Sequence, residues 1–181
     1  MKIGLHVESP SDAEFFEALL LRVLGVSPRD IVILSRRGQC IQGLSARLAS
    51  TLDEFRRLAC THVVLGADQH DAGPAEAARL AREALAMAAP LPCAIGVPQR
   101  SLEAWLLADY RTVASVLEQL PFDPPPRVEQ IQDPKRYLTS RVGTPNKFQL
   151  AGIARQMDLG LARRNSPSLD RFLRSIEEWR Q

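Results

Sequence analysis

Acidic side chains follow two apolar segments of this chain. Glu8 comes directly after segment 2–7, and Asp68, His70 and Asp71 come just after segment 62–66. If both segments are parallel strands of one sheet, their carboxyl ends meet at one edge, where open α/β sheets bind ligands. Carboxylate oxygens are the protein ligands that Mg²⁺ prefers, and water and substrate phosphates complete its coordination. We therefore expect Glu8, Asp68 and Asp71 to converge as a site for Mg²⁺ or Mn²⁺.

Each of these residues also has an ordinary structural explanation. A carboxylate such as Glu8 stabilises a neighbouring helix start through the helix dipole, and Asp68 and Asp71 are common turn formers. His70 is compatible with three roles: a ligand for a softer ion such as Mn²⁺, a general acid–base, or a plain loop residue.

Other charged residues are candidates for the same edge. Glu103 opens a helical pattern after segment 93–97 and would lie beside the same edge of the sheet, or it simply complements the helix dipole. The chain has only three lysines. Two of them, Lys135 and Lys147, could stabilise negative charge on a phosphate in the transition state. Arg36 and Arg37, after segment 31–34, could pair with phosphates. The alternative for all four basic residues is a solvated surface charge.

Strand-like and helix-like segments alternate in the first 109 residues, which predicts a mainly parallel, doubly wound sheet of about four strands. Ser11 or Asp12 is expected to cap the first helix and Ser101 the fourth. No strand pattern follows residue 109. We expect an α/β domain over 1–109 and a helical extension over 110–181 that packs on it as one compact unit.

The expected strands are 2–7, 31–34, 62–66 and 93–97. The expected helices are 12–24, 40–59, 74–88, 101–108, 111–120, 128–140, 146–156 and 168–180, the last capped by Ser168.

Composition limits the class of protein. Apolar residues make up 45% of the 181 residues, enough for a substantial core. No apolar run is long enough to span a membrane, and the first residues lack a signal-peptide pattern. The three cysteines match no metal-binding spacing, which favours reduced thiols and a cytoplasmic location. The net charge of +2 indicates no particular partner.

Six segments together resemble the Toprim superfamily, the metal-binding domain of topoisomerases, primases and OLD-type nucleases. The closer resemblance is to a stand-alone bacterial Toprim-like family, and it covers nearly the whole chain. The stretch Glu-Ala-Trp-Leu-Leu-Ala-Asp at 103–109 is its most specific part. The other segments are Val-Glu-Ser-Pro-Ser-Asp at 7–12, Leu-Gly-Ala-Asp-Gln-His-Asp at 65–71, Pro134-Lys135, Lys147 and Ser-Pro-Ser at 166–168.

The resemblance implies metal-dependent phosphodiester hydrolysis, that is, a nuclease acting on DNA or RNA. In that scheme Glu8 and Asp68 ligate Mg²⁺ or Mn²⁺, with Asp71 or His70 as a supplement. Glu103 would support a second metal or orient water, and Lys147 would stabilise the transition state. An ATPase partner in phage defence is implied as well. The chain departs from the family at two positions: Ser9 replaces a glycine and His70 replaces the second aspartate of an Asp-x-Asp pair. The alternatives are a catalytically impaired Toprim-like binding module that partners an ATPase or nucleic acid, and a phosphatase or phosphotransferase of small substrates.

Overall fold

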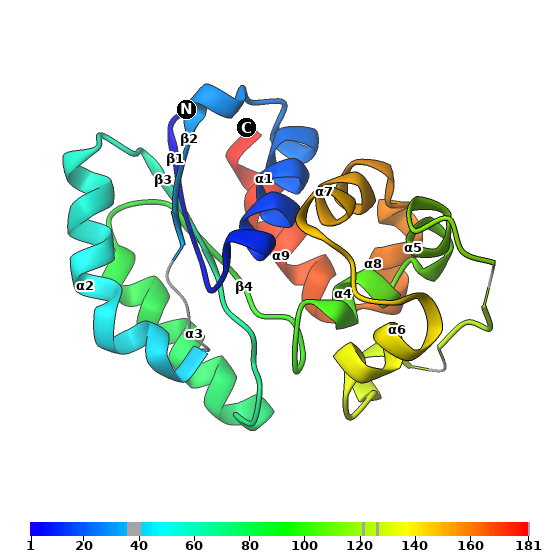
Figure 1. Ribbon diagram of the computed structural model, residues 1–181. Coiled ribbons are helices and arrows are strands. Elements are labelled where there is room, and N and C mark those ends of the chain that lie inside the picture. The colour runs from blue at the N-terminus through cyan, green and yellow to red at the C-terminus, as the bar shows by residue number, and fades with distance from the viewer. Residues whose placement is uncertain (36–40, 121, 126, 181) are drawn as a thin grey trace.

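The computed structural model describes residues 1–35, 41–120, 122–125 and 127–180, without the side chains of residues 42–46. The sheet has four parallel strands in the order β2-β1-β3-β4, with helices on both faces (Figure 1). The predicted fold class is confirmed. The elements are β1 Ile3–Val7, α1 Pro10–Leu24, η1 Pro28–Asp30, β2 Ile31–Ser35, α2 Ile41–Arg57, β3 His62–Gly66, α3 Pro74–Ala88, β4 Cys93–Gly96, α4 Glu103–Leu107, α5 Tyr110–Val116, η2 Val128–Gln130, α6 Pro134–Val142, α7 Lys147–Gln156, α8 Leu159–Asn165, α9 Pro167–Glu177 and η3 Glu178–Arg180.

The two faces of the sheet are buried in separate cores. Alternate residues of a strand point to opposite faces, so Leu5 and Val64 pack towards α1 and α9, while Val63 and Leu65 pack towards α2 and α3. The first core continues into the helices after residue 109, including Ile153 of α7. Short, continuously apolar strands are what such a doubly covered sheet requires.

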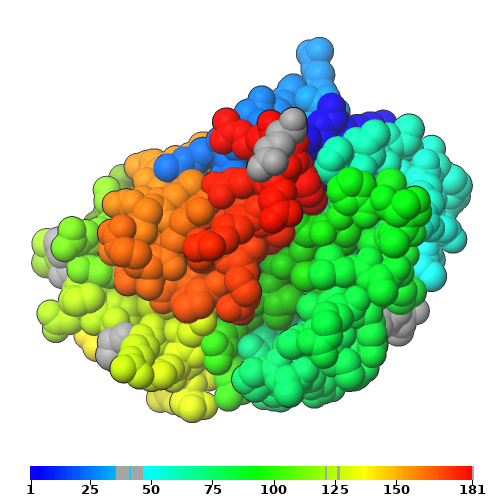
Figure 2. Space-filling view, turned by 180° about the vertical axis from the view of Figure 1, so that it is seen from behind, coloured from blue at the N-terminus to red at the C-terminus, as the bar shows by residue number. Residues whose placement is uncertain are grey.

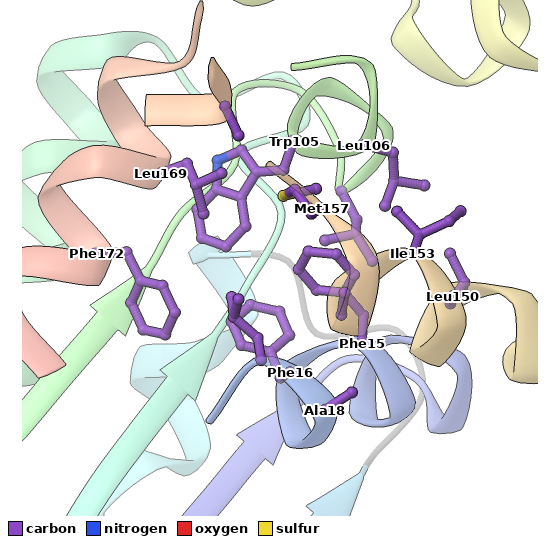
Figure 3. Close-up of a cluster of buried hydrophobic side chains, with 14 of the residues drawn as sticks. Phe15, Phe16, Ala18, Trp105, Leu106, Leu150, Ile153, Met157, Leu169 and Phe172 are labelled. Carbon is purple, nitrogen blue, oxygen red and sulfur yellow. The ribbon is translucent and has the colours of Figure 1, made fainter. Parts of the chain in front are cut away.

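Three aromatic rings join the sheet to the helical region (Figure 3). Phe16 of α1 lies 5.7 Å from Trp105 of α4 and 5.6 Å from Phe172 of α9, between ring centroids, and Trp105 stacks on Phe172 at 5.4 Å. The Trp105 indole N–H donates to Ser168 Oγ over 2.8 Å. Gly66 makes room for this cluster, because a Cβ there would lie 2.7 Å from the Phe16 ring.

Buried polar contacts fix the helices to one another. Asp109 is 1% exposed. It caps α5 by accepting from the Thr112 amide, and it also accepts from the Asp158 amide over 2.7 Å. Glu129 accepts from the Ser168 amide at the start of α9. The stretch from Ala104 to Asp109, within the most specific part of the resemblance, is therefore buried structure in this fold.

Several predicted boundaries are wrong. The cap of α1 is Ser9 rather than Ser11 or Asp12, and the cap of α9 is Ser166 rather than Ser168. The Ser101 hydroxyl forms no hydrogen bond with a described residue, so it does not cap α4. The expected helix over 128–140 is a short 3₁₀ turn followed by α6, which begins at Pro134. Helix α8 was not predicted.

None of the described helices is long and apolar enough to cross a membrane.

Candidate metal centre

Successive strands are added to the sheet first on one side of β1 and then on its other side. From β1 the chain passes through α1 to β2 on one side, and it then returns through α2 to β3 on the other side of β1. In open α/β sheets the crevice at such a switch point, at the carboxyl ends of the strands, is where ligands bind. Glu8 is the first residue after β1 and Asp68 is the second after β3, so one acidic residue flanks each side of this crevice.

Glu8, Asp68 and His70 meet there. One potential ligand atom from each lies within 4.8 Å of the other two. The His70 Nε2 atom is 3.6 Å from Glu8 Oε2 and 4.0 Å from Asp68 Oδ2. The expected convergence of Glu8 and Asp68 at one edge is therefore what the structure has.

A tight loop places His70 at the rim of the crevice. Its backbone has φ = +47°, the left-handed region that histidine enters more readily than most residues. The His70 amide donates to Arg100 O over 2.9 Å, and the Gln69 amide donates to Pro98 O over 3.2 Å. The loop after β3 is thus tied to the loop after β4, and the imidazole is left half-exposed above the two carboxylates.

Asp12 and Glu103 join Glu8 and Asp68 in a group of four carboxylates, which we call the acidic cluster. Asp12 stands in the first turn of α1, where its amide donates to Ser9 Oγ over 3.1 Å. Its pKa is raised from 3.8 to about 6, first by burial and then by the charges of Glu8 and Glu103, while hydrogen bonds with Ser9 act in the opposite direction. Sequence reasoning treated Asp12 only as a helix cap. An aspartate at the start of a helix is explained by capping alone, so this signal did not indicate a second role.

Asp68 has the most strongly raised pKa in the acidic cluster. Its pKa rises from 3.8 to about 8, first because the carboxyl is buried and then because Asp12, Glu8 and Glu103 repel its charge. A hydrogen bond from the Leu102 amide lowers the pKa in part. Without a cation, the cluster therefore holds a proton on Asp68 at neutral pH. A divalent ion would supply the positive charge that the proton provides.

One carboxylate oxygen at this edge lacks a hydrogen-bond donor, as expected of a metal ligand. Glu8 Oε2 is buried and accepts no hydrogen bond from the described residues, and the His70 nitrogen at 3.6 Å is too far to donate one. A buried carboxylate oxygen without a donor is costly, and coordination to a cation removes that cost. Carboxylate oxygens and one imidazole suit Mn²⁺, and the carboxylates alone suit Mg²⁺.

The other predicted site residues lie outside this set. The Asp71 side chain is fully exposed, with Oδ1 3.8 Å from Nη1 of Arg100, and the metal-ligand group found among the described residues does not include it. Lys135 is exposed in the first turn of α6. Arg36 and Arg37 lie outside the described residues.

Lys147 lies at the amino end of α7, and the packing of α7 shows which way that end points. Arg22, in the last turn of α1, donates to Ala154 O over 3.2 Å and to Met157 O over 2.6 Å at the carboxyl end of α7. Because α1 and α7 pack along each other and share their carboxyl ends, they run in broadly the same direction. The amino end of α7 therefore faces the same side of the molecule as the amino end of α1. The Lys147 ammonium is exposed and lies 4.9 Å from the centre of the Phe148 ring.

Comparisons with protein-family models, with curated proteins and with solved structures gave no match to this chain.

Proposed function

We propose that the acidic cluster binds Mg²⁺ or Mn²⁺ and that the protein hydrolyses phosphodiester bonds in DNA or RNA. The observation that carries the metal site is the meeting of Glu8, Asp68 and His70 at the switch point, with Glu8 Oε2 buried and without a donor. The choice of a nucleic-acid substrate, and of an ATPase as partner in phage defence, follows from the Toprim resemblance.

Glu8 and Asp68 would hold the ion, and His70 would be the third protein ligand. Imidazole is a poorer ligand for Mg²⁺ than carboxylate, so His70 favours Mn²⁺. A bound divalent ion polarises a phosphate and lowers the pKa of bound water.

The remaining acidic residues would handle the attacking water. Asp12 and Glu103 both raise the pKa of Asp68, so their charges act on the same small space. With the charge of Asp68 neutralised, either carboxylate can orient a water molecule or accept its proton. The amino ends of α1 and α7, with Lys147, face this side of the molecule and would attract the phosphate.

The test combines metal-induced stabilisation with cleavage. Thermal unfolding is measured with EDTA, Mg²⁺ and Mn²⁺ for the wild type, Glu8→Gln, Asp68→Asn and His70→Asp. Asp53→Asn, an exposed carboxylate of α2, is the control. Saturation at one hundred times Kd stabilises the folded protein by about 2.7 kcal/mol. We expect this gain in the wild type and the control, and its loss in Glu8→Gln and Asp68→Asn. His70→Asp should bind Mg²⁺ more tightly.

Cleavage of single-stranded DNA, duplex DNA and RNA is then followed in Mn²⁺ with the same proteins. Cleavage that disappears in Glu8→Gln supports the nuclease. Stabilisation by metal without cleavage of any of the three would instead indicate an impaired binding module or a small phosphorylated substrate. Absence of any response to either ion, in the wild type and in His70→Asp alike, would refute the metal centre.

A further inference from the structure

A groove runs along the outer edge of the sheet, on the side of the molecule away from α1. It has a volume of about 430 Å³ and is bounded by α3 on one side and by α9 on the other, with β4 between them. Figure 2 looks onto this side and shows the red surface of α9 beside the green surface of α3. The groove contains no residue of the acidic cluster, although Gln69 of the neighbouring loop forms part of its wall.

The strand along the groove has one unpaired edge. β4 is the last strand in the order β2-β1-β3-β4, and its described strand neighbour is β3. Pro92 O and Gly96 O accept from the Val63 and Ala67 amides of the β3 side. In a parallel ladder the backbone groups of alternate residues face one neighbour, so those of Cys93 and Ile95 face outward. No backbone hydrogen bond from another described element reaches them.

The walls of the groove accept an extended chain but exclude a second sheet. The α3 wall includes three small residues, Ala77, Ala78 and Ala81, which leave space beside the strand, and Leu85 adds an apolar surface. The α9 wall carries Ser168 and Ser175, two turns apart on one helix face. Because helices stand on both sides of the edge, a single strand can enter where a second copy of this sheet, with its own flanking helices, cannot.

The charged residues that line the groove are all positive. Arg82 projects from α3 and Arg171 from α9, both are exposed, and neither forms an ion pair with a described residue. No Asp or Glu is among the residues that line the groove. Two unpaired cations over an apolar floor favour a ligand that brings negative charge together with apolar side chains.

We propose that this groove binds an extended, acidic peptide segment of a partner protein, which adds a strand to β4. The peptide backbone would pair with the outward amides and carbonyls of Cys93 and Ile95. One row of its side chains would fill the space beside α3, and its carboxylates would pair with Arg82 and Arg171. Main-chain pairing supplies affinity and the flanking pockets supply selectivity in this mode of recognition. The proposal does not depend on the metal centre, because no residue of the acidic cluster takes part.

The probe is a phage-displayed library of random linear heptapeptides, selected on the wild-type protein. The enriched sequences are synthesised with a fluorophore, and their binding is measured by fluorescence polarisation. The groove variant is Arg82→Glu/Arg171→Glu. The control variant, Arg29→Glu/Arg111→Glu, makes the same change in net charge at exposed positions that do not line the groove. All four arginines are exposed, so loss of folding is not expected, and circular dichroism checks it.

We expect enriched peptides with acidic residues alternating with β-branched residues. Their affinity should fall about tenfold or more for the groove variant and stay within about twofold for the control. N-methylation of peptide amides at alternate positions should abolish binding in one register and spare it in the other, because only one row of amides faces β4. The amide resonances of Cys93 and Ile95 should shift on binding.

Three outcomes would overturn the proposal. They are a selection that enriches no binding peptide, peptides that bind the groove variant as well as the wild type, and peptides whose binding leaves the Cys93 and Ile95 resonances unchanged.

Discussion

The raised pKa of Asp68 predicts that the metal-free protein loses stability as the pH rises. The carboxyl titrates at about 8 in the folded protein, against an ordinary value of 3.8. Between these values the folded state holds a proton that the unfolded chain releases, so the free energy of unfolding falls with pH. The stabilisation by the protonated carboxyl is complete below the ordinary pKa and is lost as the pH rises through the folded value.

The magnitude follows from linkage. A difference of one bound proton gives a slope of about 1.4 kcal/mol per pH unit. Over the roughly three units between the ordinary pKa and neutral pH, this amounts to about 4 kcal/mol. That is a large share of the 5–15 kcal/mol, roughly, by which most domains are stable. Asp12 acts in the same direction, but its pKa of about 6 confines most of its effect to lower pH. The interval from about pH 6 to pH 8 therefore reports mainly on Asp68.

The assay is urea unfolding in EDTA across this interval, for the wild type and Asp68→Asn. The lowered pKa of His62, which results mainly from burial, contributes an opposite slope that is common to both proteins. We expect the wild type to lose about 2 kcal/mol more than Asp68→Asn over the interval. The control Asp53→Asn should follow the wild type, and saturating Mn²⁺ should remove the excess slope. Parallel pH dependences of the wild type and Asp68→Asn in EDTA would refute the electrostatic account of the cluster.

Three other perturbations test the fold. Trp105→Phe should lower the free energy of unfolding by about 2 kcal/mol in urea titrations, because it opens a cavity and leaves Ser168 Oγ without its indole donor; an unchanged midpoint would contradict this. Gly66→Ala should destabilise by about 1–3 kcal/mol, because the new methyl group would lie 2.7 Å from the Phe16 ring; thermal unfolding at or above the wild-type midpoint would exclude that clash. Burial raises the pKa of Cys93 to about 12. In a variant whose other cysteines are serine, alkylation by iodoacetamide at pH 8 should be about 30-fold slower than for an unperturbed thiol, after allowing for the higher intrinsic reactivity of a more basic thiolate; a normal rate would refute the raised pKa of this thiol.

The sheet could be predicted from the sequence because its strands are short, apolar and separated by helix-length segments. Such strands have few alternatives to burial between two helical layers. The helical region was harder to predict. Asp133-Pro134 is a cap followed by a first-turn proline, and it separates α6 from the turn before it. Helix α8 has only seven residues, so its apolar periodicity is too brief to detect, and its position depends on tertiary contacts.

The candidate site was predictable where backbone topology alone decides the geometry. Glu8 and Asp68 follow adjacent parallel strands, and their convergence needs no knowledge of side-chain conformation. That His70 joins the carboxylates while Asp71 does not depends on the left-handed backbone of His70 and on the hydrogen bond from its amide to Arg100 O. Neither feature could be predicted from the sequence. The place of Asp12 in the acidic cluster was not predicted, because helix capping was a sufficient explanation for an aspartate at that position.

The contact between α1 and α7 has a consequence for the order in which the chain can fold. The two helices are separated by more than a hundred residues, yet Arg22 reaches the carbonyls at the end of α7. During synthesis the amino-terminal segment emerges first, so the apolar face of α1 is made long before the helix that covers it. A nascent chain that ends near residue 109 would expose Phe15 and its neighbours to water. Completion of this core is therefore a late, non-local event, which favours slow folding and a period of susceptibility to aggregation or chaperone binding.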